Sequence, residues 1–351
     1  MKNIKKISIF LLVILTICFM SLVSCSKKGD DSQKQAQTKK IKIGMVTDLG
    51  GIKDQSFNQT SWEGLQKAGK ELGIDVQYLE SRQDSDYATN IQTFLDEDYD
   101  LIICVGYMLA DATRKAALEH PEQKFAIIDD SSNEDLPNVA CLMFEQATAS
   151  YLVGRVAGMM TKTNRVGFVI GMATGPMNEF GYGYLQGVRD ANPNCKVEQY
   201  NANSFADPAS GQTAARSMQT KGADIIFAAA GGTGSGVITG CQQLGIYAIG
   251  VDTDQNYIAP KTILTSAMKR VDNASYDIAK AILEGRYKAG KHVYGLESGG
   301  VDLAPTDTLL PENVKTTMAE VKKDIMSGKI KVAQNKADFE KLFGTDYYTL
   351  D

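Results

Sequence analysis

The chain is poor in the residues from which most catalytic and metal sites are built. It has only two histidines, His120 and His292, in 351 residues, and neither lies in a metal-ligand pattern. Its cysteines form no C-x-x-C pair, which argues against a zinc ribbon or a redox motif. Because no histidine accompanies a serine or cysteine in a nucleophile motif such as G-x-S-x-G, a Ser–His or Cys–His active site is disfavoured. We therefore expect no enzymatic activity, no metal and no cofactor.

The chain also lacks an excess of basic residues over acidic ones. The formal net charge is −5, and residues 1–24 carry three lysines and no acid, so a chain that begins at Cys25 has a net charge of −8. A nucleic-acid-binding surface needs the opposite sign, so nucleic acid is not an expected partner. The hydrophobic content of 43% is ample for packed cores. Residues 25–351 exceed what one core usually supports, which predicts two domains.

The long apolar run lies at the N-terminus. Three lysines precede it, and it ends in Leu22-Val23-Ser24-Cys25. A basic start, a short apolar segment and small residues at its end describe a secretory signal peptide over residues 1–24. The run is about the minimum length for a membrane span, so an uncleaved anchor is the alternative.

Cys25 indicates which kind of exported protein this is. The residues before it resemble the lipobox of bacterial lipoproteins, which implies cleavage before Cys25 and lipid on that residue. More than one acyl chain makes such attachment stable. Residues 26–40 are almost free of apolar side chains, so 25–40 is predicted to be the lipidated cysteine and a flexible tether. The expected location is the cell membrane, with the folded part facing outside the cytoplasm.

From Ile41 onward, strand and helix patterns alternate, which is typical of βαβ units and parallel sheets. This alternation predicts two doubly wound lobes with a ligand cleft between them. We predict an N-terminal lobe from 41–145 plus 266–303 and a C-terminal lobe from 146–265 plus 304–351. The expected strands are Ile41–Thr47, Ile74–Leu79, Leu101–Val105, Phe125–Ile128, Val139–Phe144, Arg165–Ile170, Lys196–Tyr200, Ile225–Ala229, Ile246–Val251 and Ile263–Met268. The expected helices are Phe57–Leu72, Tyr87–Leu95, Ala110–Leu118, Tyr151–Met160, Gly181–Ala191, Gly211–Lys221, Val237–Leu244, Asn273–Arg286 and one near Pro311–Met326.

The first strand-to-helix corner combines groups that suit a ligand. Asp48 ends a buried strand, and Phe57 and Asn58 begin the next helix. A carboxylate, an aromatic face and an amide are thus expected to converge. Asp54 and Ser56 either contact the ligand or cap the N-terminus of that helix, and the sequence is consistent with both roles. Core packing is the alternative role for Phe57.

Corresponding corners follow in the second half of the chain. Gly231–Gly236 is a glycine-rich turn that lacks the spacing of a nucleotide-phosphate loop, so close backbone approach to a neutral ligand is favoured. Asp252 ends another apolar strand, Lys269 follows the next one, and Phe205 stands at a third strand end. Carboxylates accept hydrogen bonds from vicinal hydroxyls, and phenyl rings sandwich a planar base. This set suits a ligand that joins a sugar to an aromatic ring.

Several of these segments together resemble the basic membrane protein (BMP) lipoprotein family. The resemblance covers Ile41 to about Arg286 and implies a periplasmic-binding-protein type I fold. It implies a nucleoside-binding component of an ABC importer, with permease and ATPase subunits as partners. The matching segments are Ile43–Asp48, Asp54–Gln59, Phe205–Pro208, Ala230–Gly234, Gly250–Gln255 and Met268–Arg270, together with the lipobox.

The same resemblance implies the roles of individual residues. Phe57 and Phe205 stack the base from opposite lobes, and Asp48, Asp252 and Lys269 hold ribose hydroxyls. Gly232 offers a backbone contact, and Asn58 reaches the base or the ribose. The expected ligands are purine nucleosides such as inosine, guanosine and adenosine, and the expected state is a monomer. Two other functions are weighed against this one: a surface adhesin or sensor lipoprotein of the same fold, and a nucleoside-hydrolysing enzyme.

Overall fold

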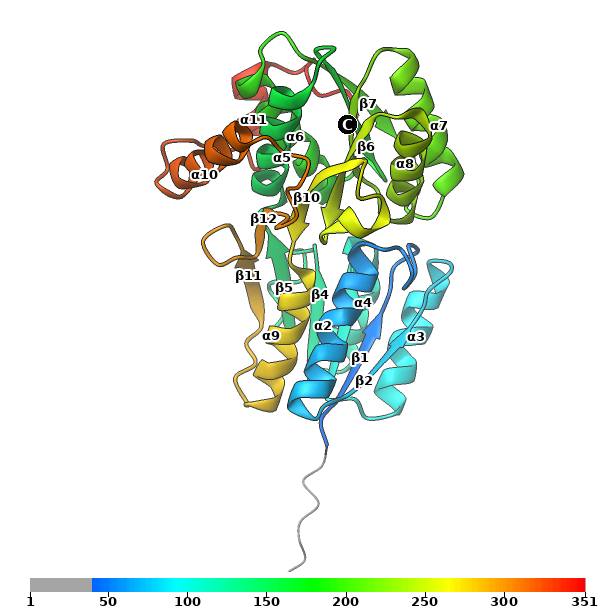
Figure 1. Cartoon of the computed structure of the whole chain (residues 1–351). Helices are drawn as coiled ribbons and strands as arrows, with labels where there is room; N and C mark the ends of the chain where they lie inside the picture. The colour runs from blue at the N-terminus through cyan, green and yellow to red at the C-terminus, as the bar shows by residue number, and fades with distance from the viewer. Residues whose placement is uncertain (1–39, 351) are drawn as a thin grey trace, which may run out of the picture. The chain divides into compact units, whose positions relative to one another are not determined.

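Two sheets organise residues 40–350, the part of the chain that the computed structural model describes (Figure 1). The first sheet contains β1 (Lys42–Val46), β2 (Asp75–Leu79), β3 (Leu101–Val105), β4 (Phe125–Ile128), β5 (Val139–Phe144) and β11 (Gly290–Tyr294). Its spatial order is β11-β5-β4-β3-β1-β2, and all neighbouring strands are parallel.

The second sheet repeats this plan. It contains β6 (Arg165–Ile170), β7 (Lys196–Asn201), β8 (Ile225–Ala229), β9 (Tyr247–Asp252), β10 (Ile263–Lys269) and β12 (Val301–Leu303). The order is β12-β10-β9-β8-β6-β7, with parallel pairs except for the antiparallel edge strand β12. The predicted α/β fold with two doubly wound, mainly parallel lobes is confirmed.

Helices cover both sheets. The first lobe has α2 (Phe57–Leu72), α3 (Ser85–Asp96), α4 (Ala110–Glu119) and α9 (Val271–Leu283), and α9 lies beside α2 although the two are far apart in sequence (Figure 1). The second lobe has α5 (Gln146–Met160), α6 (Gly175–Ala191), α7 (Pro208–Thr220), α8 (Gly231–Leu244), α10 (Glu312–Met326) and α11 (Lys336–Phe343). Short 3₁₀ turns follow β3 (η1, Tyr107–Leu109) and β9 (η2, Gln255–Ile258).

Four helices of the second lobe begin earlier than predicted: α5 starts at Gln146, α6 at Gly175, α7 at Pro208 and α8 at Gly231. In α6 and α8, tertiary packing outweighs the low helix propensity of glycine. A Cβ at Gly236 of α8 would collide with the backbone of α7 at Pro208, so only glycine allows this approach. The glycine-rich turn is therefore the first turn of α8, packed against its neighbour.

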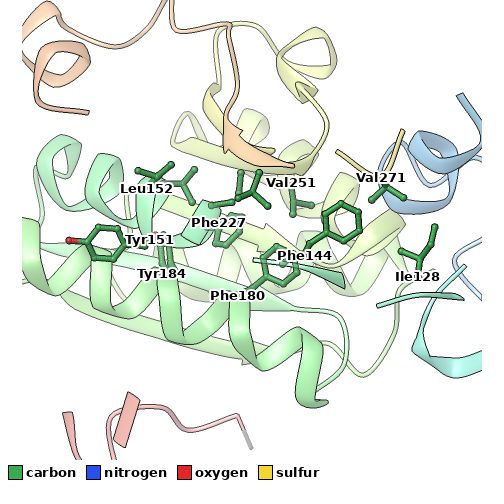
Figure 2. Packing of buried hydrophobic residues seen from close by; sticks show 14 of the residues in the cluster. Ile128, Phe144, Tyr151, Leu152, Phe180, Tyr184, Phe227, Val251 and Val271 are labelled. Carbon is green, nitrogen blue, oxygen red and sulfur yellow. The ribbon is translucent and has the colours of Figure 1, made fainter. Parts of the chain in front are cut away.

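The core extends from one sheet toward the other. Figure 2 shows Phe144 of β5 next to Phe180 of α6, with Phe227 of β8 beyond them. The rings of Phe180 and Phe227 lie 6.4 Å apart between centroids, and both side chains are almost fully buried. Aromatic pairs of this kind bury large apolar areas and restrict how the elements around them can shift. The end of β5 and the start of α6 are thus held firmly beside the carboxyl ends of the strands.

The lobe boundaries differ from the predicted positions 266 and 303. β10 remains hydrogen-bonded in the second sheet through Met268, and β12 pairs with it from Val301. The segment that returns to the first sheet therefore begins after Lys269 and consists of α9 and β11. The apolar pattern of Ile263–Met268 suits either sheet, so only its pairing with β9 decides the lobe.

Some predictions fall outside the described residues: the signal peptide 1–24, the lipidated Cys25 and the tether up to residue 39. Among residues 40–350, none of the helices combines the length and the apolar character that a membrane crossing requires. The four cysteines in this range, Cys104, Cys141, Cys195 and Cys241, are buried free thiols, and burial raises the pKa of each.

Candidate functional site

A cavity lies where the carboxyl ends of both sets of strands meet, with walls from both lobes and about 490 Å³ of space free of protein atoms, open solvent at its mouth included. This is the position at which doubly wound sheets bind ligands. Six of the seven predicted site residues line it: Asp48, Phe57, Asn58, Phe205, Asp252 and Lys269. Gly232 does not line the cavity, whereas its neighbour Gly231 does.

The first-lobe corner is a closed network of polar groups. Asn58 donates from its amide nitrogen to Asp48 Oδ1 over 2.7 Å and to Asp54 Oδ2 over 3.1 Å. Its side-chain oxygen accepts from the Asp48 backbone N–H, and Gly50 N–H donates to Asp48 Oδ1. Because both amide hydrogens of Asn58 are already donated, this side chain orients Asp48 in the structure.

Asp54 caps α2. Its carboxylate accepts from the backbone N–H groups of Ser56, Asn58 and Gln59 at 2.9, 2.9 and 3.1 Å. These are the amides that a helix start leaves without partners. Of the two capping candidates in the sequence, Asp54 is therefore the cap, and the Ser56 hydroxyl is free for another partner.

That partner is Asp252 in the other lobe. The Ser56 hydroxyl donates to Asp252 Oδ2 in a buried contact that joins the two lobes. Nearby, Gln255 Nε2 donates to the Gln55 carbonyl over 2.8 Å, while Gln255 Oε1 accepts from Val251 N–H. These bonds join the β1–α2 corner of the first lobe to the β9 corner of the second.

Burial raises the pKa values of the carboxylates in the site. Removal from water raises the pKa of Asp48 to about 6, although hydrogen bonds from Asn58 and Gly50 oppose the shift. Burial likewise raises the pKa of Asp252 to about 7, against the positive charge of Lys269 and the Ser56 hydrogen bond. The pKa of Asp54 is raised for the same reason. Near neutral pH Asp48 is mostly ionised, whereas Asp252 is close to its midpoint.

Lys269 is a buried cation with a buried partner. Its ammonium pairs with Asp129 Oδ2, and the side chains are 2% and 6% exposed. The same ammonium lies over the rings of Phe57, Phe144 and Phe180, at 5.1 to 5.4 Å from their centroids. A buried lysine is tolerated only with such compensation, so its position is well determined.

Two half-buried phenylalanines supply aromatic walls from different lobes. Phe57 is the first residue of α2, and Phe205 lies in the loop before α7. Thr233 of α8 fastens that loop, because its N–H donates to the Phe205 carbonyl and its hydroxyl donates to the Ser204 carbonyl. The Phe57 ring also packs against the hydrophobic core, whereas the Phe205 ring lies so close to Gly171 that a Cβ there would collide with it.

Sequence reasoning missed several lining residues, among them Asp129, Tyr107, Met177 and Phe180. Asp129 directly follows the predicted strand Phe125–Ile128, so the strand-end signal that marks Asp48 and Asp252 marks it too. Met177 and Phe180 lie in the first turns of α6, which was predicted to begin only at Gly181. Within residues 40–350, no group of three or more His, Cys, Asp or Glu side chains is arranged to hold a metal ion.

Comparisons with known proteins agree with this geometry. Residues 41–336 match the family model described as "ABC transporter substrate-binding protein PnrA-like". A "CD4+ T-cell-stimulating antigen" of Listeria innocua is 40% identical over 89% of this chain and 94% of its own length. The "ABC transporter nucleoside-binding protein BmpA" of Lactococcus lactis is 37% identical over 83% of this chain and 89% of its own.

Further similarity extends to spirochaetes and to a solved structure. "Basic membrane protein A1" of Borrelia garinii is 33% identical over 94% of this chain and 98% of its own length. The crystal structure of an ABC transporter solute-binding protein from Aeropyrum pernix superposes with a TM-score of 0.78 at 28% identity. That match covers 86% of this chain and 96% of the other.

Proposed function

The chain belongs to the PnrA-like, or basic membrane protein, family of ABC transporter substrate-binding proteins, and from this premise we propose that it is a lipid-anchored receptor for purine nucleosides. In this proposal it binds the nucleoside outside the cytoplasm and delivers it to an ABC permease and its ATPase. The observation that carries the proposal is the cavity in which Phe57 and Phe205, from different lobes, accompany strand-end carboxylates.

The chemistry of the cavity supports a ligand with an aromatic base and a sugar. Phenyl faces stack on planar bases, and such stacking contributes about 1–3 kcal/mol per base. Asp48 and Asp252 are acceptors for hydroxyl groups, and Lys269 is a donor beside them. The Lactococcus relative, whose name describes nucleoside binding, supports the same ligand class.

Charge favours a nucleoside over a nucleotide. The charged lining residues are Asp48, Asp54, Asp129, Asp252 and Lys269, and the lysine is already paired with Asp129. A phosphate group would add negative charge beside buried carboxylates with no free cation among the lining residues of the described chain. Such like-charge contacts in a desolvated site are strongly unfavourable. We therefore expect the 5′ end of the ligand to be an uncharged hydroxyl.

Titration calorimetry on the purified full chain in detergent tests the ligand. Inosine, guanosine and adenosine should bind with micromolar or tighter affinity, cytidine more weakly, and inosine monophosphate at least about tenfold more weakly than inosine. Absence of heat with every nucleoside would refute the receptor proposal and favour the alternative of a surface interaction protein. Stronger binding of the monophosphate would refute the charge argument alone.

Labelling with palmitate in a bacterial host tests the anchor. The wild-type chain should incorporate label, and Cys25→Ala should not. Cys18→Ala is the matched control, because Cys18 precedes the proposed cleavage site and its loss should leave labelling unchanged. Label retained in Cys25→Ala would contradict the anchor without affecting the ligand proposal.

A further inference from the structure

Three short segments connect the two lobes within residues 40–350. The chain crosses from β5 to α5 at Glu145, from β10 to α9 at Arg270, and from β11 back to β12 through residues 295–300. Backbone hydrogen bonds join these crossings. Glu145 N–H donates to the Tyr294 carbonyl over 3.1 Å, and Arg270 N–H donates to the Gly300 carbonyl over 2.9 Å. Because the crossings are bonded to one another, they form one hinge about which the lobes can rotate.

The ligand cavity lies on one side of this hinge. In each sheet the strands run from a hinge edge, β11 or β12, to a far edge, β2 or β7. Cavity residues such as Asp48 after β1 and Asp252 of β9 lie beyond the crossing strands β5 and β10. On that side the lobes are in contact, because Ser56 donates to Asp252 and the Tyr107 hydroxyl lies 3.7 Å from Met172 Sδ. These contacts identify the arrangement as a closed one.

A second groove, the hinge groove, lies at the other edge of the hinge, beside β11. Its walls come from both lobes: Val293 of β11 faces Ile325 and Met326 of α10 and Val332 after it, with crossing residues 295–298 between them. Val293 is 54% exposed and Met326 is 47% exposed. The closed arrangement therefore leaves apolar side chains of both lobes in water on either side of one groove, which is unfavourable.

Opening moves the two sides of the hinge in opposite directions. A rotation about the crossings that separates the walls of the cavity brings the walls of the hinge groove toward each other. Val293 and Met326 can then lose contact with water together, and the area that they bury stabilises the open form. The closed form lacks this contribution, because both side chains are about half exposed in it.

We propose that the hinge groove stabilises the open, ligand-free state, through an apolar contact between Val293 and Met326 that forms when the cavity opens. Closure around a ligand breaks this contact, so the measured affinity is lower than the closed cavity alone would give. The groove thus sets the balance between empty and loaded receptor from outside the cavity, which goes beyond the proposed choice of ligand.

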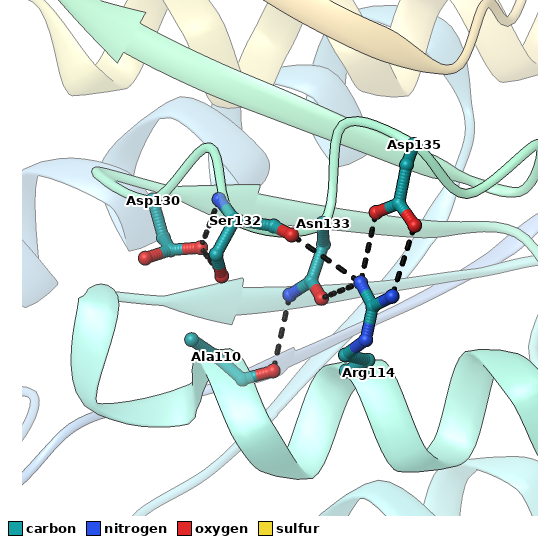
Figure 3. A network of polar contacts seen from close by, with 6 residues as sticks. All are labelled: Ala110, Arg114, Asp130, Ser132, Asn133 and Asp135. Atoms are coloured by element: carbon teal, nitrogen blue, oxygen red, sulfur yellow. Dashed lines mark hydrogen bonds and ion pairs between the residues drawn. The ribbon is translucent and has the colours of Figure 1, made fainter.

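Two near-isosteric substitutions weaken the proposed contact. Met326→Gln and Val293→Thr keep the approximate size of each side chain and make it polar. Leu118→Gln is the matched control, because Leu118 is 60% exposed and lies outside the groove. It belongs to α4 of the first lobe, the helix whose Arg114 pairs with Asp135 (Figure 3).

A third substitution should act in the opposite direction. Glu297 is an exposed residue of the groove, so Glu297→Leu enlarges its apolar wall and should stabilise the open form. Variants that differ in the sign of their effect distinguish the proposed contact from a general loss of stability, which has one sign only.

Double electron–electron resonance on the full chain in detergent measures opening directly. Spin labels at Gln83→Cys and Ala209→Cys report it, because both positions are exposed and come after β2 and β7, the strands farthest from the hinge. The native cysteines within residues 40–350 are buried and should stay unlabelled. Without ligand, the labelled wild type should show a long distance, and saturating inosine should replace it by a shorter one.

The groove variants should change these populations in the ligand-free chain. Met326→Gln and Val293→Thr should increase the share of the short distance, Glu297→Leu should increase the share of the long one, and Leu118→Gln should match wild type. Calorimetric titration with inosine should follow the same order. The first two should bind about two- to fivefold more tightly than wild type, and Glu297→Leu about two- to fivefold more weakly.

Unchanged distances and affinities in the groove variants would overturn the proposal, as would a ligand-free wild type that is already closed. A shift of equal size in Leu118→Gln would overturn it too, because the effect would not depend on the groove. If the wild type does not bind inosine, the proposed function fails instead, and the ligand-free distances still decide the role of the groove.

Discussion

The two lobes hold the carboxylates that line the cavity in different ways. In the first lobe, Asp48 is oriented by Asn58 and Gly50, which belong to the same corner. In the second lobe, the hydrogen bond that Asp252 accepts from a side chain comes from Ser56 of the first lobe. Half of the site is therefore organised by one lobe alone, whereas the other half is completed only when the lobes meet. A ligand that needs both halves stabilises the closed arrangement.

Burial raises the pKa of Asp48 to about 6 and that of Asp252 to about 7. Hydrogen bonds within its own corner oppose the shift of Asp48, whereas Lys269 and the Ser56 hydroxyl of the other lobe oppose that of Asp252. Opening of the lobes would return water to Asp252 first, because its partner lies on the other side. The charge on the second-lobe carboxylate is thus linked to closure.

Of the substitutions that compare the two lobes, Asp252→Asn should weaken ligand binding most. It removes a charged acceptor for a ligand hydroxyl and weakens the bridge to Ser56, so binding should be less favourable by roughly 2–4 kcal/mol. Titration calorimetry with inosine measures it. Asp207→Asn, which changes an aspartate that caps α7 outside the cavity, should bind like wild type. An unchanged affinity in Asp252→Asn would contradict the placement of the site.

The same variant should gain stability at high pH. The folded-state pKa of Asp252 is raised above its unfolded value of 3.8, so its stabilising contribution is full below that value and is lost as pH rises through about 7. Asp252→Asn avoids this loss and should melt at a temperature higher by about 2–4 °C at pH 8, with a smaller gain at pH 5. Differential scanning calorimetry at the two pH values would contradict the argument if the gain were larger at pH 5.

Phe57→Leu and Phe205→Leu compare the aromatic walls of the two lobes. Each should weaken nucleoside binding by about 1–3 kcal/mol, because an aliphatic side chain keeps the apolar contact but loses base stacking. Phe57→Leu should cost more, since its ring also lies 5.1 Å from the Lys269 ammonium. Phe343→Leu, in α11 and away from the cavity, serves as the control in the same titrations. Wild-type affinity in both site variants would exclude a stacked base.

Asn58→Ala tests whether the first-lobe corner is organised by its own hydrogen bonds. Without the amide, the pKa of Asp48 should rise above about 6, because one of the contacts that lowers it is gone. Binding that needs an ionised Asp48 should then weaken by about 1 kcal/mol at pH 7, and its fall at acidic pH should begin at a higher pH than in wild type. Calorimetry between pH 5 and pH 8 records the shift. A parallel loss at all pH values would indicate a packing effect only.

Gln255→Ala should have the smallest effect, because it leaves the cavity intact and removes a bond between the lobes. The Gln55 carbonyl and Val251 N–H lose their partner, so ligand-free protein should open more and binding should weaken by about 0.5 kcal/mol. Small-angle scattering should show a larger radius of gyration without ligand and the wild-type value with saturating inosine. Asn256→Ala, in the same 3₁₀ turn, is the control. Identical scattering for both variants would show that Gln255 does not hold the lobes together.

Much of the fold was predictable because its signals are local. Apolar runs such as Leu101–Val105 and the helical spacing of Phe57–Leu72 mark strands and helices directly, and β3 and α2 appear at those bounds. The helix starts at Gly175 and Gly231 were not predictable, because α6 and α8 owe their glycine-rich first turns to tertiary packing further along: Gly183 and Gly236 lie directly against the backbones of neighbouring helices. The lobe of β10 was not predictable either, because strand pairing is a property of the folded sheet.

The candidate site was likewise predictable only where its signals are local. Strand-end residues such as Asp48 and Asp252 were identifiable from the order of apolar and polar residues alone. The links between them were not, because Ser56 and Asp252 are 196 positions apart and Lys269 and Asp129 are 140 apart. No local pattern encodes which carboxylate faces which cation.

By itself, the amino-acid sequence determined the rhythm of strands and helices, the family, and the residue types available at each strand end. Only the tertiary structure decided that Asp129 belongs with those residues, that Asn58 serves Asp48, and that Asp252 depends on the opposite lobe. The physical reason is that propensity and hydrophobic period act between near neighbours. Burial, ion pairing and the satisfaction of polar groups depend instead on which distant segments the fold brings into contact.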